Sequence, residues 1–170
     1  MKTRLAPLIV CVIVLAGAAA AQAQSALDRA RRDEIVSVPR GDPAMEAAFA
    51  KARATLDDFL KVLTAPPPDT YGFAVKIPIR DGREVEYFWV IDIERDGDRF
   101  RGQINNTPRT VRTVRNGEVI AFARADIHDW MYVDDARRRM MGNFTLCALL
   151  TREKPDEAAQ MKRRFGLTCD

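Results

Sequence analysis

The sequence has a single histidine, His128, and an aspartate and a tryptophan follow it in the segment IHDWMYV. Histidine and aspartate can act together in general acid–base catalysis, so this segment is the first candidate for a catalytic site. A hydrolase triad, however, needs three side chains within hydrogen-bonding distance, and consecutive residues of a strand point to opposite faces of the sheet. The pattern therefore favours a surface position for His128 over a catalytic role.

Metal and cofactor sites need sets of residues that this sequence does not offer in the required spacings. It has one histidine and no C-x-x-C motif, and its carboxylates lack the spacing of a calcium loop. No phosphate-binding loop, nucleophile elbow or dinucleotide fingerprint is present. Two carboxylates that converge in space would suit a glycoside hydrolase, although the sequence singles out no such pair. We expect neither a metal nor a cofactor.

The segment INNTPRTV has the composition of a turn at the edge of a sheet. Asn105, Asn106 and Pro108 are expected to form a turn through hydrogen bonds from side chain to backbone. Asp129, next to the histidine, is a candidate to tie down a neighbouring loop by the same kind of bond. We take these residues as part of a candidate binding surface.

Trp130 and Tyr132 share one face of the same expected strand, and Trp89 lies on another. Large aromatic side chains most often fill the core of a small sheet, and we favour that position for Trp89. For Trp130 two positions stay open, because polar residues flank it: the core, or a strand end within reach of a partner. Trp130 and Tyr132 are therefore included in the candidate binding surface.

A strip of five arginines without an acidic residue lies between positions 99 and 117. Its members, here named the arginine strip, are Arg99, Arg101, Arg109, Arg112 and Arg115. Such a run is usually a solvated face. The alternative is an electropositive surface that meets an acidic partner or a phosphate, since the guanidinium group suits both. Arg109 and Arg112 complete the candidate binding surface.

Residues 1–23 have the pattern of a secretory signal peptide. Lys2 and Arg4 precede an apolar run, and the small residues of an A-x-A site end at Ala23. An uncleaved membrane anchor is the alternative, but the strongly apolar part, Leu8–Leu15, is short for a span of about 20 residues. We expect cleavage after Ala23, a periplasmic or secreted protein, and no stable membrane anchor.

The chain that remains after cleavage is almost neutral. Removing the signal takes away two of the 27 Lys and Arg and none of the 24 Asp and Glu, so the net charge is about +1. This balance gives no reason to expect nucleic acid. Two cysteines remain, Cys147 and Cys169, in a compartment that favours disulfides. A disulfide between them is the leading hypothesis, and a buried free thiol beside an unrelated tail cysteine is the alternative.

Hydrophobic periodicity indicates the elements that must position these residues. After a polar arm (24–41), Asp42 and Pro43 look like a helix start, and apolar residues then recur at steps of three and four as far as Leu63. The prolines of APPPD end this helix of about twenty residues. A period of two follows, and the strand candidates are residues 73–79, 85–93, 99–104, 110–114, 118–122 and 127–133.

The end of the chain is less regular. The apolar run NFTLCALL has no clear period, whereas KPDEAAQMKRRF is expected to form a helix that starts near Pro155. Short strands with closely spaced turns predict an α+β domain over residues 42–170. We expect an N-terminal amphipathic helix packed on a twisted antiparallel sheet or an SH3-like, partly open barrel, with a C-terminal helix.

Several segments, taken in order, resemble the DUF2314 family of bacterial domains of unknown function. The secreted members of this family look like the YegJ-type proteins. The matching segments are MEAAFAKARATLDDFL, FAVKIPI, EYFWV, FRGQINNTPRTVRTVRNGEVIAF, IHDWMYVD and MGNFTL, within residues 43–150. The most specific pieces are the NNTP turn, the V-x-x-G hairpin and the DWM tripeptide. The resemblance implies no activity. Its motif residues are mostly the types that a twisted sheet needs: Trp89, Gly102, Asn106, Pro108, Gly117, Asp129, Trp130 and Gly142.

Two departures from the family pattern bear on chemistry. The family usually has a small hydroxyl residue where this chain has His128, which weakens a catalytic role for the histidine. Where this chain has Cys147 the family more often has a basic residue, and Cys169 is an addition to the family core. The resemblance therefore supports the disulfide.

Three functions follow from these patterns as hypotheses. The first is a non-enzymatic periplasmic binding module whose partner is a protein or an anionic envelope component. The second is a small hydrolase or lyase acting on cell-wall material, with Asp129 as base and Asn106 as polarising group. The third, an immunity or inhibitor factor for a secreted toxin, is physically a form of the first.

Overall fold

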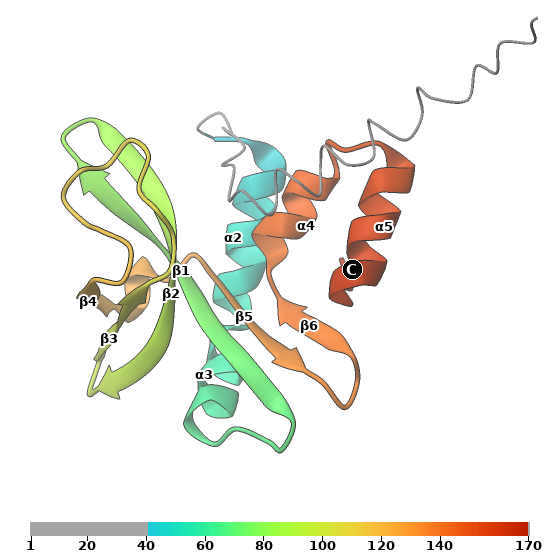
Figure 1. Ribbon diagram of the computed structural model, residues 1–170, viewed down its shortest axis with the longest axis horizontal. Coiled ribbons are helices and arrows are strands. Elements are labelled where there is room, and N and C mark those ends of the chain that lie inside the picture. The colour runs from blue at the N-terminus through green and yellow to red at the C-terminus, as the bar shows by residue number, and fades with distance from the viewer. Residues whose placement is uncertain (1–40, 170) are drawn as a thin grey trace, which may run out of the picture.

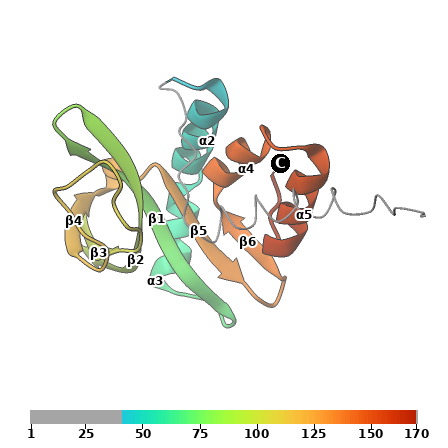
Figure 2. The ribbon, with the colours of Figure 1, turned by 45° about the horizontal axis from the view of Figure 1, so that its top comes forward.

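The computed structural model describes residues 41–169 of the chain. The predicted signal peptide (1–23) and the predicted arm (24–41), apart from Gly41, lie outside these residues. Within the described part, no helix is both long enough and apolar enough to cross a bilayer. The described part is α+β, as predicted, with helices packed on one antiparallel sheet (Figures 1 and 2).

The first helix, α2 (Pro43–Ala54), begins as the sequence predicts. The Asp42 carboxylate accepts the backbone N–H of Met45 at 2.9 Å, and Pro43 occupies the first turn, where its missing N–H costs nothing. The side chains that α2 buries include Phe49 and Ala52, which face the sheet and its neighbouring helices.

The predicted single helix of about twenty residues is in fact two. Helix α2 ends at Ala54 and α3 (Leu56–Thr64) begins after Thr55, whose backbone leaves helical geometry. The Thr55 hydroxyl donates to the carbonyl of Lys51 at 2.8 Å. A side-chain hydroxyl that bonds to the preceding turn competes with the backbone ladder and bends a helix, which explains the break.

Six strands form one open antiparallel sheet in the order β4-β3-β2-β1-β5-β6. Of the two predicted alternatives, this is the twisted sheet. Figure 1 shows the long strands β1 and β2 curving through the middle of the molecule. The strands are β1 (Thr70–Asp81), β2 (Glu84–Asp96), β3 (Arg99–Ile104), β4 (Val119–Ala123), β5 (Asp129–Asp134) and β6 (Arg139–Gly142).

Two parts of the sequence fold differently from the expected pattern. The predicted strand at 110–114 is a loop, because its first backbone donors bind the side chain of Glu86 and not a neighbouring strand. The run NFTLCALL, which periodicity did not assign, forms helix α4 (Phe144–Leu150) directly after β6. Residues 124–126 form a single 3₁₀ turn between β4 and β5.

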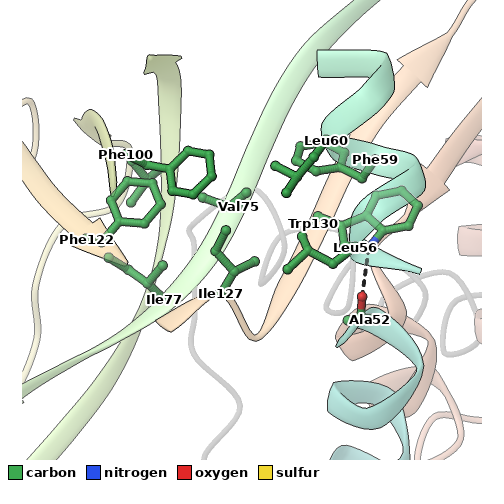
Figure 3. Close-up of a cluster of buried hydrophobic side chains, with 11 residues drawn as sticks. Ala52, Leu56, Phe59, Leu60, Val75, Ile77, Phe100, Phe122, Ile127 and Trp130 are labelled. Atoms are coloured by element: carbon green, nitrogen blue, oxygen red, sulfur yellow. Dashed lines mark hydrogen bonds between the residues drawn. The ribbon is translucent and has the colours of Figure 1, made fainter. Parts of the chain in front are cut away.

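The main core lies between the sheet and helices α2 and α3 (Figure 3). Trp130 of β5 stacks on Phe59 of α3 with ring centres 5.1 Å apart. Its indole N–H donates to the Ala52 carbonyl at 3.1 Å, so the buried indole has the partner that such a group requires. Phe100 and Phe122 extend the same core toward β3 and β4.

The C-terminal part packs as a separate small cluster. Helix α5 (Pro155–Phe165) is present where the sequence predicts it, and buries Met161 against Leu150 and Leu167. The predicted disulfide between Cys147 and Cys169 is formed, with Cα atoms 5.4 Å apart. It ties the chain after α5 to α4.

Candidate functional site

A row of polar and aromatic side chains crosses the sheet on the face opposite Val75, a residue of the main core. Lys76 of β1 lies directly across from Trp89 of β2 and from Asp129 of β5, and residues paired in this way share a face. The Lys76 ammonium lies 4.5 Å from the centre of the Trp89 ring and donates to Thr145 Oγ1 at 2.6 Å. These contacts hold one positive charge at the centre of the face.

Asp129 forms the buried end of this row. Its side chain is fully buried, and its carboxylate accepts the backbone N–H of Trp130, Phe144 and Thr145 and the Thr145 hydroxyl. Two of these N–H groups belong to the first turn of α4, where they have no partner within the helix. Burial raises the pKa of Asp129, against the opposing effects of the Lys76 charge and the hydrogen bonds. The carboxylate fixes the start of α4 and presents no oxygen to a substrate.

A second buried carboxylate, that of Glu86, organises the loop between β3 and β4. Its side chain accepts the backbone N–H groups of Arg109, Thr110 and Val111 at 3.0–3.1 Å, and the Thr110 hydroxyl at 3.1 Å. Consecutive N–H groups that converge on one anion form a nest. Burial alone would raise the pKa of Glu86, but these hydrogen bonds together hold it below its ordinary value. The loop is therefore folded around an ionised side chain.

Asn105 and Asn106 attach the start of the same loop to strand β2. The Asn105 backbone N–H donates to the Trp89 carbonyl at 2.8 Å, and the Asn106 side-chain oxygen accepts the Trp89 N–H at 2.7 Å. The predicted bond between an asparagine side chain and the backbone is thus present. Its partner is the N–H of Trp89 in β2, seventeen residues away along the chain. Asn105 itself is exposed beside Trp89, and the half-buried Pro108 follows in the loop.

His128 lies at the other border of the row. Its Nδ1 is 3.0 Å from the Asp126 carbonyl, which can only accept, so this nitrogen carries the proton. The ring packs edge-on against Phe49 of α2 and Tyr87 of β2, with centres 5.0 and 5.5 Å apart. Tyr87 is 38% exposed. We name the surface formed by Lys76, Tyr87, Trp89, Asn105 and His128 the polar–aromatic face.

The residues predicted for a binding surface do not all meet on this face. Trp130 is buried in the core, and Tyr132 is half-buried there against Phe73, with ring centres 5.3 Å apart. Both point to the side covered by α2 and α3. Like Asp129, both side chains therefore stabilise the fold, whereas the asparagine pair borders the polar–aromatic face.

The arginine strip is exposed along its whole length. On β3, however, Arg99 and Arg101 lie directly across from Asp96 and Glu94 of β2. Opposite charges in these positions offset each other. Arg112 donates its backbone N–H to the Asp81 carboxylate at 2.9 Å, so an acidic group also lies next to the loop part of the strip. The structure thus places acids, absent from the local sequence, beside the strip.

Sequence reasoning missed the most informative residues, which are Lys76, Glu86 and Thr145. Lys76 carries a weak signal, since it is the one charged residue inside the apolar strand FAVKIPI. Glu86 and Thr145 carry none, because their partners lie 23 to 25 and 16 to 69 residues away along the chain. Among residues 41–169, no group of three or more His, Cys, Asp or Glu side chains could hold a metal ion.

A hollow of about 400 Å³ lies away from the polar–aromatic face. It is lined by residues of α3 together with Arg95 and Arg124, and an ion pair of 2.7 Å between Asp57 and Arg124 borders it. Asn106 and Asp129 do not line this hollow. The arrangement expected for a hydrolase, with both side chains in one cleft, is therefore not found there.

Comparison with known proteins gives one family and one relative. A family model described as "Uncharacterized protein conserved in bacteria (DUF2314)" matches residues 42–169. A protein of Neisseria meningitidis serogroup B, named "Putative ankyrin repeat protein", is 31% identical over 141 residues. The match covers 78% of this chain and 55% of the relative, so the chain spans about half of its length. No solved structure matches significantly.

Proposed function

The chain belongs to the DUF2314 family of conserved bacterial proteins, and from that premise we propose that it is an exported, non-enzymatic binding module that recognises a protein partner. The partner is bound by the polar–aromatic face. The loop residues Pro108, Arg109 and Arg112, which follow Asn105, form the rim of the contact.

The proposal rests on the hydrogen bonds of Asp129 and Asn106, the two residues that were candidates for catalysis. Asp129, the candidate base, accepts four hydrogen bonds from its own chain and is fully buried. Asn106, the candidate polarising group, bonds to the Trp89 backbone. A general base must reach the proton that it abstracts. The geometry therefore supports binding over the hydrolase or lyase.

The polar–aromatic face has the composition of a binding surface. Tyrosine and tryptophan are the residues most enriched among those that dominate interface energies, and both are present beside a positive charge held in place. Tyr87 is held by stacking on Phe49, with ring centres 5.4 Å apart. Side chains that are already ordered lose less entropy on binding, so the face is preorganised for a partner.

The similarity to the Neisseria protein supports the same class of function. That protein is named for ankyrin repeats, and repeat arrays of this kind present extended binding surfaces. A module that recognises a protein partner is consistent with similarity to a protein of that name. An immunity or inhibitor factor is one form of this proposal, and the identity of the neighbouring genes would distinguish it.

Export is supported by two features of the chain. Residues 1–23 have the signal pattern, and the disulfide between Cys147 and Cys169 suits an oxidising compartment. Intact-mass analysis of the protein isolated from its host tests this part. We expect a chain that begins at Gln24 and lacks free thiols, whereas a full-length, reduced chain in the cytoplasm would contradict export.

Binding is tested by affinity capture from an envelope extract with the chain from Gln24 onward. We expect a partner that is retained by the natural chain and reduced roughly tenfold by Tyr87→Ala combined with Asn105→Ala. The matched control is Tyr71→Ala combined with Val119→Ala, which truncates two exposed side chains elsewhere. Equal capture by both folded variants would contradict the assignment of the face.

A further inference from the structure

Two runs of basic residues, far apart in the sequence, lie together at the C-terminal end of the fold. Arg137, Arg138 and Arg139 form the turn between β5 and β6 and the start of β6, and the run 162–164 (Lys-Arg-Arg) forms the last full turn of α5. Five of these six residues are exposed, and Lys162 is half-buried. We name them the basic cluster.

The contact between the two runs is made by backbone. The Met140 N–H donates to the Gly166 carbonyl at 3.2 Å, and Met140 also forms an isolated parallel bridge with Leu167. Gly166 packs so closely on the Arg138 carbonyl that a Cβ there would clash with it. Figures 1 and 2 both show α5 beside β6. The disulfide to Cys169 fixes the chain just after this contact.

The basic cluster has little acidic compensation. Arg137 pairs with Asp134 at 2.6 Å, and Asp135 is exposed in the same turn. Within residues 41–169, none of Arg138, Arg139 and Arg163 forms an ion pair. The arginine strip is different, because acidic residues of β2 lie across from its β3 members. The basic cluster is therefore the stronger concentration of positive charge.

The ordinary structural reasons account for only part of the basic cluster. Cations at the C-terminal end of a helix are favourable, which explains the run on α5. It does not explain the turn, where Arg138 has a φ of 51°. This left-handed conformation is easier for glycine or asparagine than for arginine. A costly residue at an exposed turn, next to two other arginines, indicates a use for its charge.

We infer that the basic cluster is a docking surface for an anionic lipid bilayer. Groups of four to eight Lys and Arg on one surface bind anionic headgroups, and each charge adds to the affinity. The cluster comprises an exposed turn and the end of a helix, which can meet a flat surface together. Proteins that bind single-stranded nucleic acid combine basic residues with exposed stacking aromatics. Phe165, the aromatic ring that Arg164 contacts, is half-buried in the C-terminal core.

This docking surface is separate from the polar–aromatic face. The face lies on β1 and β2, and the cluster begins at β6, two strands from β1 in the sheet. The two surfaces can therefore be occupied together. A chain that is exported as proposed would by this means be held at the membrane surface while it binds its protein partner.

The test is co-sedimentation of the disulfide-bonded chain, from Gln24 onward, with vesicles of phosphatidylcholine alone or mixed with phosphatidylglycerol. We expect binding only to the mixed vesicles, with loss at high salt. Arg138→Gln, Arg139→Gln and Arg163→Gln together should weaken it roughly a hundredfold, about fivefold for each charge. The matched control, Arg99→Gln, Arg101→Gln and Arg115→Gln, removes the same charge and should change it less than threefold.

Three results would overturn the inference. One is absence of binding to the mixed vesicles. Another is an equal loss in the two triple variants, which would show a response to net charge alone. The third is displacement from the vesicles by a single-stranded oligonucleotide at a lower phosphate concentration than the lipid, which would make nucleic acid the partner. Capture of a protein partner by the first triple variant, measured alongside, shows independently whether the polar–aromatic face still functions.

Discussion

Two buried carboxylates, Asp129 and Glu86, organise the segments that the sequence singled out as candidate sites. Asp129 belongs to IHDWMYV, and Glu86 binds backbone N–H groups of INNTPRTV. Each accepts several backbone N–H groups that have no partner in regular structure. Each is nearly or fully removed from solvent. A buried charge is tolerated only when it is hydrogen-bonded or paired, and both residues meet this condition. Their role at the residue scale is to hold α4 and the loop after β3.

Replacing Asp129 with asparagine should strongly destabilise the protein. An amide has one acceptor oxygen in place of two, turns a donor toward the donors of α4, and removes the negative charge beside Lys76. We expect a loss of about 3 kcal/mol in the free energy of unfolding, measured with urea. Asp135→Asn, at an exposed turn position, is the control and should change it by less than about 0.5 kcal/mol. Similar stability of both variants would contradict the role of Asp129.

Glu86 predicts a specific dependence of stability on pH. Because its pKa is lowered in the folded state, the unfolded state binds the proton more readily, and folding is favoured as the pH rises. This contribution is present above pH 4.5, the ordinary pKa of a glutamate, and is lost as the pH falls through the folded pKa. Asp129, whose pKa is raised, acts in the opposite direction. The contribution of Glu86 must therefore be measured as the difference in stability between the natural chain and a variant that lacks this carboxylate.

The measurement is the difference in the free energy of unfolding between the natural chain and Glu86→Gln, at neutral pH and in acid. At neutral pH we expect the variant to be less stable by about 2 kcal/mol, since hydrogen bonds to a charged group are lost. The difference should shrink as the pH falls below 4.5. A difference that stays constant with pH would show that Glu86 is not ionised in the fold.

At the scale of elements, the sequence predicts what depends on neighbours along the chain. The start of α2, the long strands and the start of α5 follow from caps and periodicity. The break at Thr55 and the loop at 110–114 do not, because each depends on a side chain that competes with a regular backbone ladder. In the same way Asn106 was predictable as a backbone-bonding residue, but Lys76 and Thr145 became visible only through long-range contacts.

Gly142 should be required for the junction between β6 and α4. Its φ is +75°, and a Cβ there would clash with the carbonyl and the ring of Trp130. Gly97 has a similar φ of +61° with nothing near its Cβ position, so a substitution there costs only the unfavourable backbone conformation. We expect Gly97→Ala to lose about 1 kcal/mol and Gly142→Ala at least about 3 kcal/mol. Equal losses in urea unfolding would contradict the close packing on Trp130.

The disulfide should stabilise the C-terminal part of the fold. It closes a loop with a sequence separation of 22 residues, for which the chain-entropy model gives about 3 kcal/mol. Replacing both cysteines with serine should lower the free energy of unfolding by about that amount. Reducing agent should lower it equally in the natural chain and not at all in the variant. An unchanged stability would show that the small cluster around Met161 suffices.

At the scale of the whole molecule, one sheet supports two surfaces with different chemistry. The polar–aromatic face lies over β1 and β2, beside α2, and the basic cluster surrounds the contact between β6 and α5. Whole-chain charge predicted neither surface, because a net charge of +3 hides a local concentration of six cations. Family membership assigns no activity to the chain, so its function must be argued from these surfaces.

The most direct test of the binding proposal is photo-crosslinking in intact cells. A photoreactive phenylalanine derivative replaces either Tyr87 or Tyr71, two exposed tyrosines of which only Tyr87 belongs to the polar–aromatic face. If the protein binds its partner as proposed, a discrete protein adduct forms from position 87 and not from position 71. Adducts of equal intensity from both positions, or none from position 87, would contradict the proposal that this face binds a protein.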